Sequence, residues 1–141
     1  MLAVQIKNIN YSIRKRPILQ NINFELNKDT IACILGPSGS GKTTLLKLIA
    51  GLEKVQSGSI FINGQEVSNP KKHTPTEKRK IGFLFQDYAL FPHLTVKENL
   101  EFPINFKNSI HNIDDIIDLK KLPNSLNKYP HELSGGEQQR V

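Results

Sequence analysis

A glycine-rich segment just before residue 44 constrains this chain more than any other feature. Its eight residues read GPSGSGKT, which fits the spacing G-x-x-x-x-G-K-[ST]. A continuously apolar stretch precedes it at residues 31–35, and a helical pattern follows at residues 42–50 and ends at Gly51. In this context, glycines let backbone N–H groups surround phosphate oxygens, and the helix start adds partial positive charge. The segment therefore predicts a phosphate-binding loop rather than a glycine-rich turn with an unrelated lysine.

Individual side chains of this loop have separate expected roles. Lys42 is placed to reach the β- and γ-phosphates of a nucleotide, and the Thr43 hydroxyl is placed to ligate Mg²⁺. The residues that we expect to contact the nucleotide are Gly36, Pro37, Ser38, Gly39, Ser40, Gly41, Lys42, Thr43 and Thr44.

Hydrophobic patterning predicts an α/β core around the loop. Residues 2–6, 22–26 and 59–62 alternate between apolar and polar side chains, as half-buried strands do. The last of these segments ends at the turn pair Asn63-Gly64. The apolar stretch before the loop predicts a strand buried on both faces, and residues 81–85 return to strand character.

Helical patterns dominate after residue 86. The capping box that begins at Thr95 predicts a helix start, and isoleucines share one helical face at residues 113–117. We therefore expect a nucleotide-binding core at residues 1–86 and a helical subdomain at residues 87–141. Between the strands, residues 69–80 predict a surface loop, and its solvated basic side chains are Lys71, Lys72, Lys78, Arg79 and Lys80.

Composition excludes several classes of protein. No stretch approaches the roughly 20 apolar residues of a membrane-spanning helix, and the N-terminus lacks the pattern of a signal peptide. The single Cys33 excludes a disulfide framework, and no Cys/His spacing indicates a zinc site. We therefore expect a soluble cytoplasmic protein. The net charge of +6 permits nucleic acid, an anionic membrane surface or phosphate-bearing ligands.

Two further segments narrow the prediction. Phe85-Gln86-Asp87 stands in the middle of the chain, and LSGGEQQR stands at residues 133–140. Together with the glycine-rich loop, in this order, they resemble the ATP-binding subunits of ABC transporters over the whole chain. The wording FQDYALFPHLTVKENL and YPHELSGGEQQRV is most similar to importer ATPases for molybdate, sulfate or polyamines, with molybdate favoured.

The resemblance implies a fold and a set of cofactors. The expected fold is a P-loop NTPase core, with a mixed sheet and an N-terminal antiparallel strand layer, plus an all-helical subdomain. The implied cofactors are ATP and Mg²⁺, and Gln86 would meet the metal or the attacking water. The second LSGGEQQR-containing subunit would contact the γ-phosphate through its copy of Ser134, Gly135, Gly136 and Glu137. The same four residues also fit a capping box, which is compatible with that role.

The family also stacks an aromatic side chain on adenine. Tyr11 is the nearby tyrosine, although the usual position falls at Ile13, so a packed strand-end tyrosine is an equal alternative. None of the four histidines shows metal-ligand spacing. The resemblance also assigns residues 88–94 to a groove for a permease helix, and an ordinary helix-packing cluster is the alternative.

The implied function is ATP-driven import across the cytoplasmic membrane. The expected partners are a membrane permease and a second ATP-binding subunit, with the protein held at the inner face of the membrane and with no specific nucleic acid. The family's later apolar strand ending in Asp-Glu does not occur before Val141. We therefore expect the first part of a longer subunit, incomplete at its C-terminus and inactive alone. The alternatives are a P-loop ATPase acting on nucleic acid and a non-hydrolysing nucleotide-binding module.

Overall fold

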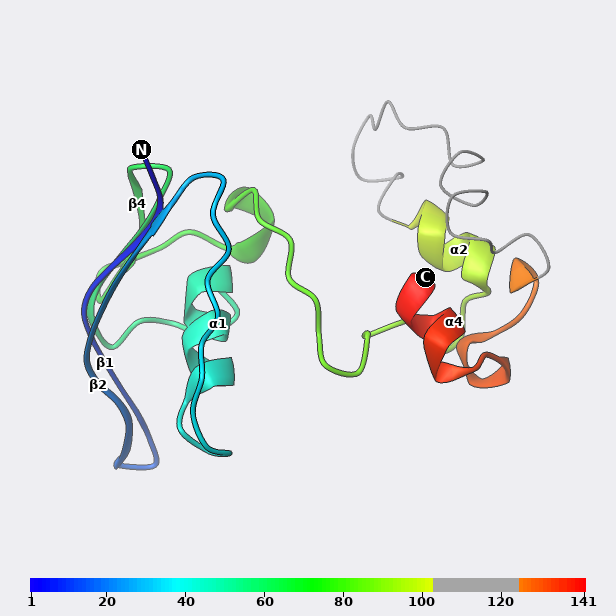
Figure 1. The fold of residues 1–141 in the computed structure, drawn as a ribbon, viewed down its shortest axis with the longest axis horizontal. Coiled ribbons are helices and arrows are strands. Elements are labelled where there is room, and N and C mark those ends of the chain that lie inside the picture. Colours follow the sequence, from blue (N-terminus) through cyan, green and yellow to red (C-terminus); the bar gives the residue numbers. More distant parts are fainter. Residues whose placement is uncertain (103–124) are drawn as a thin grey trace. The chain divides into compact units, whose positions relative to one another are not determined.

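The computed structural model describes residues 1–102 and 125–141. They belong to two compact units, Met1–Phe83 and Leu84–Val141 (Figure 1). The first unit is built on a sheet of five strands in the order β2-β1-β3-β4-β5, and every neighbouring pair is antiparallel. The strands are β1 (Leu2–Ile13), β2 (Arg16–Asn27), β3 (Ser57–Ile62), β4 (Gln65–Asn69) and β5 (Lys72–His73).

Two tight turns fix the hairpins of this sheet. Arg14 and Lys15 join β1 to β2 with φ values of 48° and 67°, and Asn63 and Gly64 join β3 to β4 with φ values of 50° and 77°. Two successive positive φ values are typical of the type I′ turn, whose twist matches that of paired strands. The strand predicted at residues 59–62 and the turn predicted at Asn63-Gly64 are therefore confirmed.

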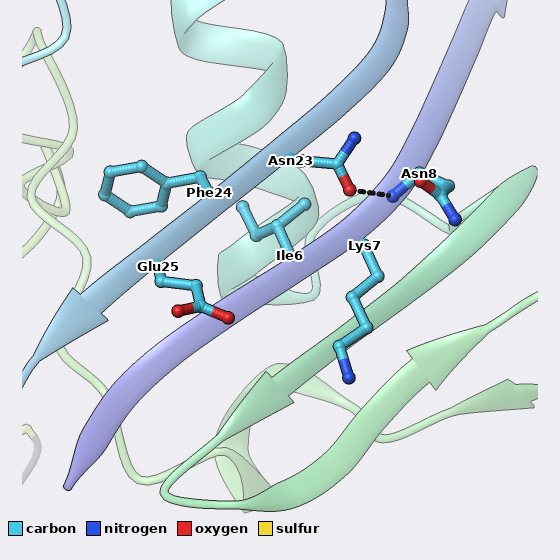
Figure 2. A pocket seen from close by; sticks show the side chains of 6 residues that line it. All are labelled: Ile6, Lys7, Asn8, Asn23, Phe24 and Glu25. Carbon is cyan, nitrogen blue, oxygen red and sulfur yellow. Dashed lines mark hydrogen bonds between the residues drawn. The ribbon is translucent and has the colours of Figure 1, made fainter.

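Asparagine side chains supply hydrogen bonds where the pairing of β1 with β2 is irregular. The register shifts between Ile6 and Ile9, and there the backbone N–H of Asn8 donates to Asn23 Oδ1 at 3.0 Å. A shallow pocket opens beside this shift, lined by Ile6, Lys7, Asn8, Asn23, Phe24 and Glu25 (Figure 2). Since a β-bulge leaves backbone groups without their ladder partner, the asparagine amide takes that place.

One helix covers the sheet in the first unit. Helix α1 (Lys42–Ala50) begins at the residue that the sequence predicts and ends before Gly51, which has a φ of 84°. Its side chains Leu45 and Leu48 are buried in one hydrophobic cluster with Ile6 and Ile60 of the sheet. Figure 1 shows α1 running beside the sheet. This packing holds the start of α1 and the loop before it against the strands.

The two strands predicted at residues 31–35 and 81–85 are wrong, because neither segment belongs to the described sheet. Ile31 is 101% exposed, Leu35 is 85% exposed and Leu84 is 77% exposed. An apolar segment becomes a strand only where another strand pairs with its backbone. The order of the five strands contains neither segment, so the sheet of the described residues is antiparallel rather than mixed. The α/β fold class is confirmed.

The loop predicted at residues 69–80 contains more structure than expected. It includes β5 and a short 3₁₀ helix, η1 (Thr76–Lys78). Lys71, Lys72, Lys78 and Lys80 are exposed as predicted, whereas the prediction is wrong for Arg79, which is 2% exposed.

The second unit is helical in its described residues. Helix α2 (Val96–Glu101) starts with the predicted capping box, in which Glu98 N–H donates to Thr95 Oγ1 and Thr95 N–H donates to Glu98 Oε2. Val96 and Leu133 form a small buried cluster between α2 and the segment before α4 (Gly135–Arg140). A second 3₁₀ helix, η4 (Pro130–Glu132), precedes α4. No helix within residues 1–102 and 125–141 is long and apolar enough to cross a membrane.

Two predictions stay open at this level. The helix expected at residues 113–117 lies outside the described residues. The domain division expected after residue 86 also stays a prediction. The boundary between the two compact units lies between Phe83 and Leu84 along the chain.

Candidate phosphate-binding site

Two glycines give the loop before α1 its backbone path. Gly39 has a φ of 78° and Gly41 has a φ of 92°, a region that residues with a Cβ rarely adopt. Gly41 also lies directly against β2, since a Cβ there would stand 2.8 Å from Leu19 Cδ2 and 3.2 Å from the carbonyl oxygen of Ile18. The conformation of the loop and its close approach to the sheet therefore both depend on glycine.

The ammonium of Lys42 lies inside this loop. Its Nζ donates to the carbonyl oxygens of Gly36 and Pro37, each at 2.7 Å, and to Ser40 Oγ at 3.4 Å. These contacts use the three donors of the ammonium. The positive charge is thereby held at the centre of the loop and beside the start of α1, where a phosphate would receive it together with the helix N-terminal N–H groups.

The first turn of α1 carries two threonines that could serve a nucleotide. Thr43 is exposed and Thr44 is half-buried, and both follow Lys42 directly. Within the described part of the chain, no group of three or more His, Cys, Asp or Glu side chains could hold a metal ion. A hydroxyl suits Mg²⁺, which proteins commonly bind through few side chains together with substrate phosphates. The donor set at this loop therefore fits Mg²⁺ only when the ion arrives with a nucleotide.

Tyr11 lies in the core of the first unit. Its side chain is 9% exposed, packs in the hydrophobic cluster with Leu19, and donates its hydroxyl proton to Glu53 Oε2 at 3.0 Å. Burial and the Glu53 carboxylate raise the pKa of Tyr11. This burial favours the packed strand-end tyrosine over an adenine-stacking role. Ile13, the other position considered, is 48% exposed.

Gln86 belongs to the second unit and lies at the start of a turn. It is exposed, and Tyr88 N–H donates to the carbonyl oxygen of Phe85 across this turn at 3.2 Å. Tyr88 and Ala89 continue the turn with φ values of 60° and 51°. The contact of Gln86 with a metal or a water stays a prediction, because the loop at residues 36–43 belongs to the other unit.

The LSGGEQQR segment forms a tightly capped helix start. Ser134 Oγ accepts the N–H of Glu137 at 3.3 Å, and Glu137 Oε2 accepts both the N–H of Ser134 at 2.8 Å and its hydroxyl at 2.7 Å. Ser125 Oγ donates to the other oxygen, Oε1, at 3.1 Å. The Ser134 hydroxyl, its backbone N–H and then Ser125 lower the pKa of Glu137 to about 2. The capping box is therefore confirmed.

The two glycines of this segment have no steric role in the described fold. A Cβ built at Gly135 meets nothing within 4 Å, and one at Gly136 meets only Arg140 Nη1 at 3.8 Å. Both residues lie in helical backbone and are exposed. The helix start consequently presents a bare backbone surface to solvent, next to the Ser134 hydroxyl.

The sequence does not single out two structurally important residues. Arg79 was one of several adjacent basic residues, and a local pattern does not indicate which of them is buried. Asn99 holds the turn at residues 91–95, because its Oδ1 accepts Phe91 N–H and its Nδ2 donates to three carbonyl oxygens, those of Phe91, Leu94 and Thr95. The one indication in the sequence is that Asn99 stands four residues after the capping Thr95, on the same face of the helix.

Comparison with known proteins agrees with this arrangement of motifs. The family model described as "ABC transporter" matches residues 19–141. The spermidine/putrescine import ATP-binding protein PotA of Thermotoga maritima is 41% identical over 98% of this chain and 38% of its own length. The sulfate/thiosulfate import ATP-binding protein CysA of Synechocystis sp. is 39% identical over 99% of this chain and 40% of its own length. The chain thus spans well under half the length of these relatives.

A solved structure of an ATP-binding cassette has a similar fold. It is a dimeric ATP-binding cassette in a post-hydrolysis state, bound to ADP and Pi, with a TM-score of 0.80 and 32% sequence identity. The match covers 97% of this chain and 66% of that one. Since the family model covers most of the sequence and both curated relatives match along nearly all of it, this chain belongs to the ABC transporter family, as part of an ATP-binding domain.

Proposed function

We propose that this chain binds Mg²⁺-ATP at the loop of residues 36–43 and serves as the ATP-binding part of an ABC importer. The observation that carries the proposal is the placement of the Lys42 ammonium at the centre of a glycine-shaped loop that opens α1. Phosphate oxygens would replace the loop carbonyls as partners of this ammonium, and the N–H groups at the start of α1 would complete their coordination. Thr43 would hold Mg²⁺, which would neutralise charge on the phosphates.

We propose that a second ATP-binding subunit completes the site. The capped start of α4 supports this, because Gly135 and Gly136 leave its backbone open to a close approach that the fold does not otherwise need. The capping box holds Ser134 and Glu137 in one arrangement and bonds their own N–H groups, so Gly135 and Gly136 between them would offer their backbone to a ligand. A phosphate bound in the other subunit would be the group that approaches this surface.

Import is the activity that the relatives' names support, and we propose that it proceeds through a membrane permease. The turn at residues 88–95 carries Phe91, which is 38% exposed and lies 4.5 Å from the ring of Phe102. Asn99 holds residues 91–95 of this turn through its side-chain hydrogen bonds. We propose that this aromatic surface receives a permease helix. Gln86, five residues before Phe91, would transmit the closure of the two subunits around ATP to that helix. The protein would then lie at the inner face of the membrane.

The motifs and the relatives' names indicate different transported solutes. The names of the two curated relatives mention spermidine or putrescine and sulfate or thiosulfate, whereas the wording of the motifs favoured molybdate. The proposed site handles the nucleotide, so its residues do not identify the solute. Uptake of molybdate, sulfate and spermidine should be compared between cells that carry the gene for this protein and cells that lack it. The solute whose uptake falls in the deletion cells is the one transported.

Hydrolysis needs more than the loop supplies. The loop offers N–H groups, Lys42 and Thr43 for ground-state binding, whereas turnover also needs a positioned water and a general base. Gln86 could orient a water but has no group that accepts its proton at neutral pH. We therefore propose that a polypeptide limited to these 141 residues binds Mg²⁺-ATP without measurable turnover. Release of phosphate at about 1 s⁻¹ or faster, abolished by Lys42→Ala, would contradict this.

Calorimetric titration with Mg²⁺-ATP tests the binding site itself. Lys42→Ala should weaken binding strongly while far-UV circular dichroism stays unchanged, since the hydrogen bonds of the Lys42 ammonium are to the loop. Lys47→Ala is the matched control, because it removes the same charge from the last turn of the same helix. Unchanged ATP affinity in a folded Lys42→Ala chain, or an equal loss in Lys47→Ala, would refute the assignment of the loop.

A further inference from the structure

A buried arginine with every donor satisfied lies at the C-terminal end of α1. Arg79 is 2% exposed, although it stands in a run of basic residues. A guanidinium has five N–H donors, and Arg79 places them on five acceptors. Nε donates to Thr74 O at 2.7 Å, Nη1 to Leu48 O at 2.9 Å and Ile49 O at 2.8 Å, and Nη2 to Ser68 Oγ at 3.3 Å and His73 Nδ1 at 3.4 Å.

The charge of Arg79 is matched by the end of a helix. Leu48 and Ile49 lie in the last turn of α1, where carbonyl groups lack helical partners and the helix dipole is negative. No carboxylate within residues 1–102 and 125–141 forms an ion pair with Arg79. A Cβ at Gly51 would overlap the guanidinium at Nε, so the glycine that ends α1 also makes room for Arg79.

The same guanidinium ties α1 to the far edge of the sheet. Ser68 lies in β4, and Thr74 N–H donates to Val67 O of β4 at 2.8 Å. A guanidinium can only donate, so Nδ1 of His73 accepts this hydrogen bond. Burial, and then the charges of Arg79 and Lys54, lower the pKa of His73, which agrees with this contact. Arg79 therefore joins three elements, the last turn of α1, strand β4 and the β5–η1 segment.

The other end of α1 has its own fixed point. Gly41 lies against Ile18 and Leu19 of β2, at the start of the helix. A helix of nine residues is roughly 13 Å long, so a shift at one end changes the direction of the whole axis. With Gly41 at one end and Arg79 at the other, α1 has one orientation relative to the sheet.

We infer that Arg79 is a positioning residue for the phosphate-binding loop, acting through α1 from the end of the helix opposite to the nucleotide. The inference rests on the proposed function at residues 36–43. Without the guanidinium, α1 keeps its contact at Gly41 but loses the donors that hold its last turn, so the helix tilts about Gly41. The N–H groups that open α1, together with Lys42, then no longer converge on one phosphate position.

Three variants of the 141-residue chain separate this role from a general loss of charge. Arg79→Met keeps an unbranched apolar stem, and Arg79→Lys keeps the charge but replaces the planar fork with one point of donation. Lys78→Met is the matched control, because it removes an adjacent positive charge from an exposed side chain. Each variant is titrated with Mg²⁺-ATP at a temperature where circular dichroism shows it folded, and the amide NMR resonances of Gly39 and Gly41 are compared.

We expect Arg79→Met to bind Mg²⁺-ATP about tenfold more weakly, as small misplacements of binding groups produce. Arg79→Lys should lie between Arg79→Met and wild type, and Lys78→Met should match wild type. The Gly39 and Gly41 resonances should shift in both Arg79 variants and stay in place in Lys78→Met. A stability loss alone would not move these resonances in a folded chain.

Several results would overturn the inference. They are unchanged affinity in folded Arg79 variants, weaker binding with unmoved Gly39 and Gly41 resonances, or an equal effect of Lys78→Met. If Arg79→Met does not fold, Arg79→Lys decides between these outcomes. If wild type itself does not bind Mg²⁺-ATP, the proposed function fails, and the resonances alone then decide whether Arg79 positions the loop.

Discussion

Replacing the two glycines of the loop one at a time separates backbone conformation from close packing. Gly39 and Gly41 both have left-handed φ values, 78° and 92°. A Cβ at Gly39 meets nothing within 4 Å, whereas one at Gly41 stands 2.8 Å from Leu19 Cδ2 and 3.2 Å from Ile18 O. The two alanine variants therefore share one cost and differ in the other.

The shared cost is that of a left-handed residue with a Cβ, about 1–2 kcal/mol, and alanine offsets part of it by restricting the unfolded chain. We expect Gly39→Ala to lower the free energy of unfolding by about 1 kcal/mol on that balance. Gly41→Ala adds overpacking against β2, which costs about 1–3 kcal/mol more. The carbonyl oxygen of Ile18 is backbone and moves only with the strand, whereas the shortest contact is with the end of the Leu19 side chain, so the middle of that range applies.

Urea unfolding followed by far-UV circular dichroism measures both values on the same chain. The expected result is a larger loss for Gly41→Ala than for Gly39→Ala, by about 2 kcal/mol, with equal dependence on urea concentration. Leu19 is itself buried in the core, so Leu19→Ala destabilises on its own, but it should cost less in the Gly41→Ala background than in wild type because it also removes the close contact. Equal destabilisation by the two glycine substitutions would refute the close approach of the loop to β2.

Three further results are expected. Because its native pKa of about 2 lies below the ordinary 4.5, Glu137 stabilises the fold above that ordinary value and loses this contribution as the pH falls toward 2; Glu137→Gln should flatten the acid unfolding curve over that interval. Tyr11→Phe should lower the free energy of unfolding by about 0.5–1.5 kcal/mol through the lost hydrogen bond to Glu53, with calorimetric Mg²⁺-ATP affinity unchanged; a weaker affinity would restore an adenine contact for Tyr11. Asn99→Ala removes four hydrogen bonds from the turn at residues 91–95, so exchange of the Phe91 amide hydrogen should accelerate; unchanged exchange would contradict a rigid turn.

The elements that depend on neighbouring residues followed from the sequence. Helix α1 has the predicted bounds at Lys42 and Ala50, and capping boxes start α2 and α4 where Thr95 and Ser134 predicted them. Each of these features is decided by groups within four positions of one another along the chain. The turn at Asn63 is of the same kind.

The candidate site was predictable for a related reason. The glycine spacing determines a local backbone path, and Lys42 lies within reach of that path whatever the rest of the chain does. Tyr11 was not decided in this way, because an aromatic residue at a strand end suits both a core and a ligand surface. Its contacts with Leu19 and Glu53 come from distant positions and place it in the core.

The sequence by itself determined the α/β class, the glycine-rich loop before α1 and the helix caps, since residues close together along the chain decide all three. Tertiary structure alone decided which apolar segments become strands and which basic residue is buried. Ile31 and Leu84 have strand-like surroundings in sequence but stay exposed, because a strand forms only beside a partner. Arg79 is buried where its neighbours Lys78 and Lys80 are not, because the carbonyl ends of α1 and the side chains of β4 and β5 meet at that one position. Such a meeting of distant segments has no signature in the local sequence.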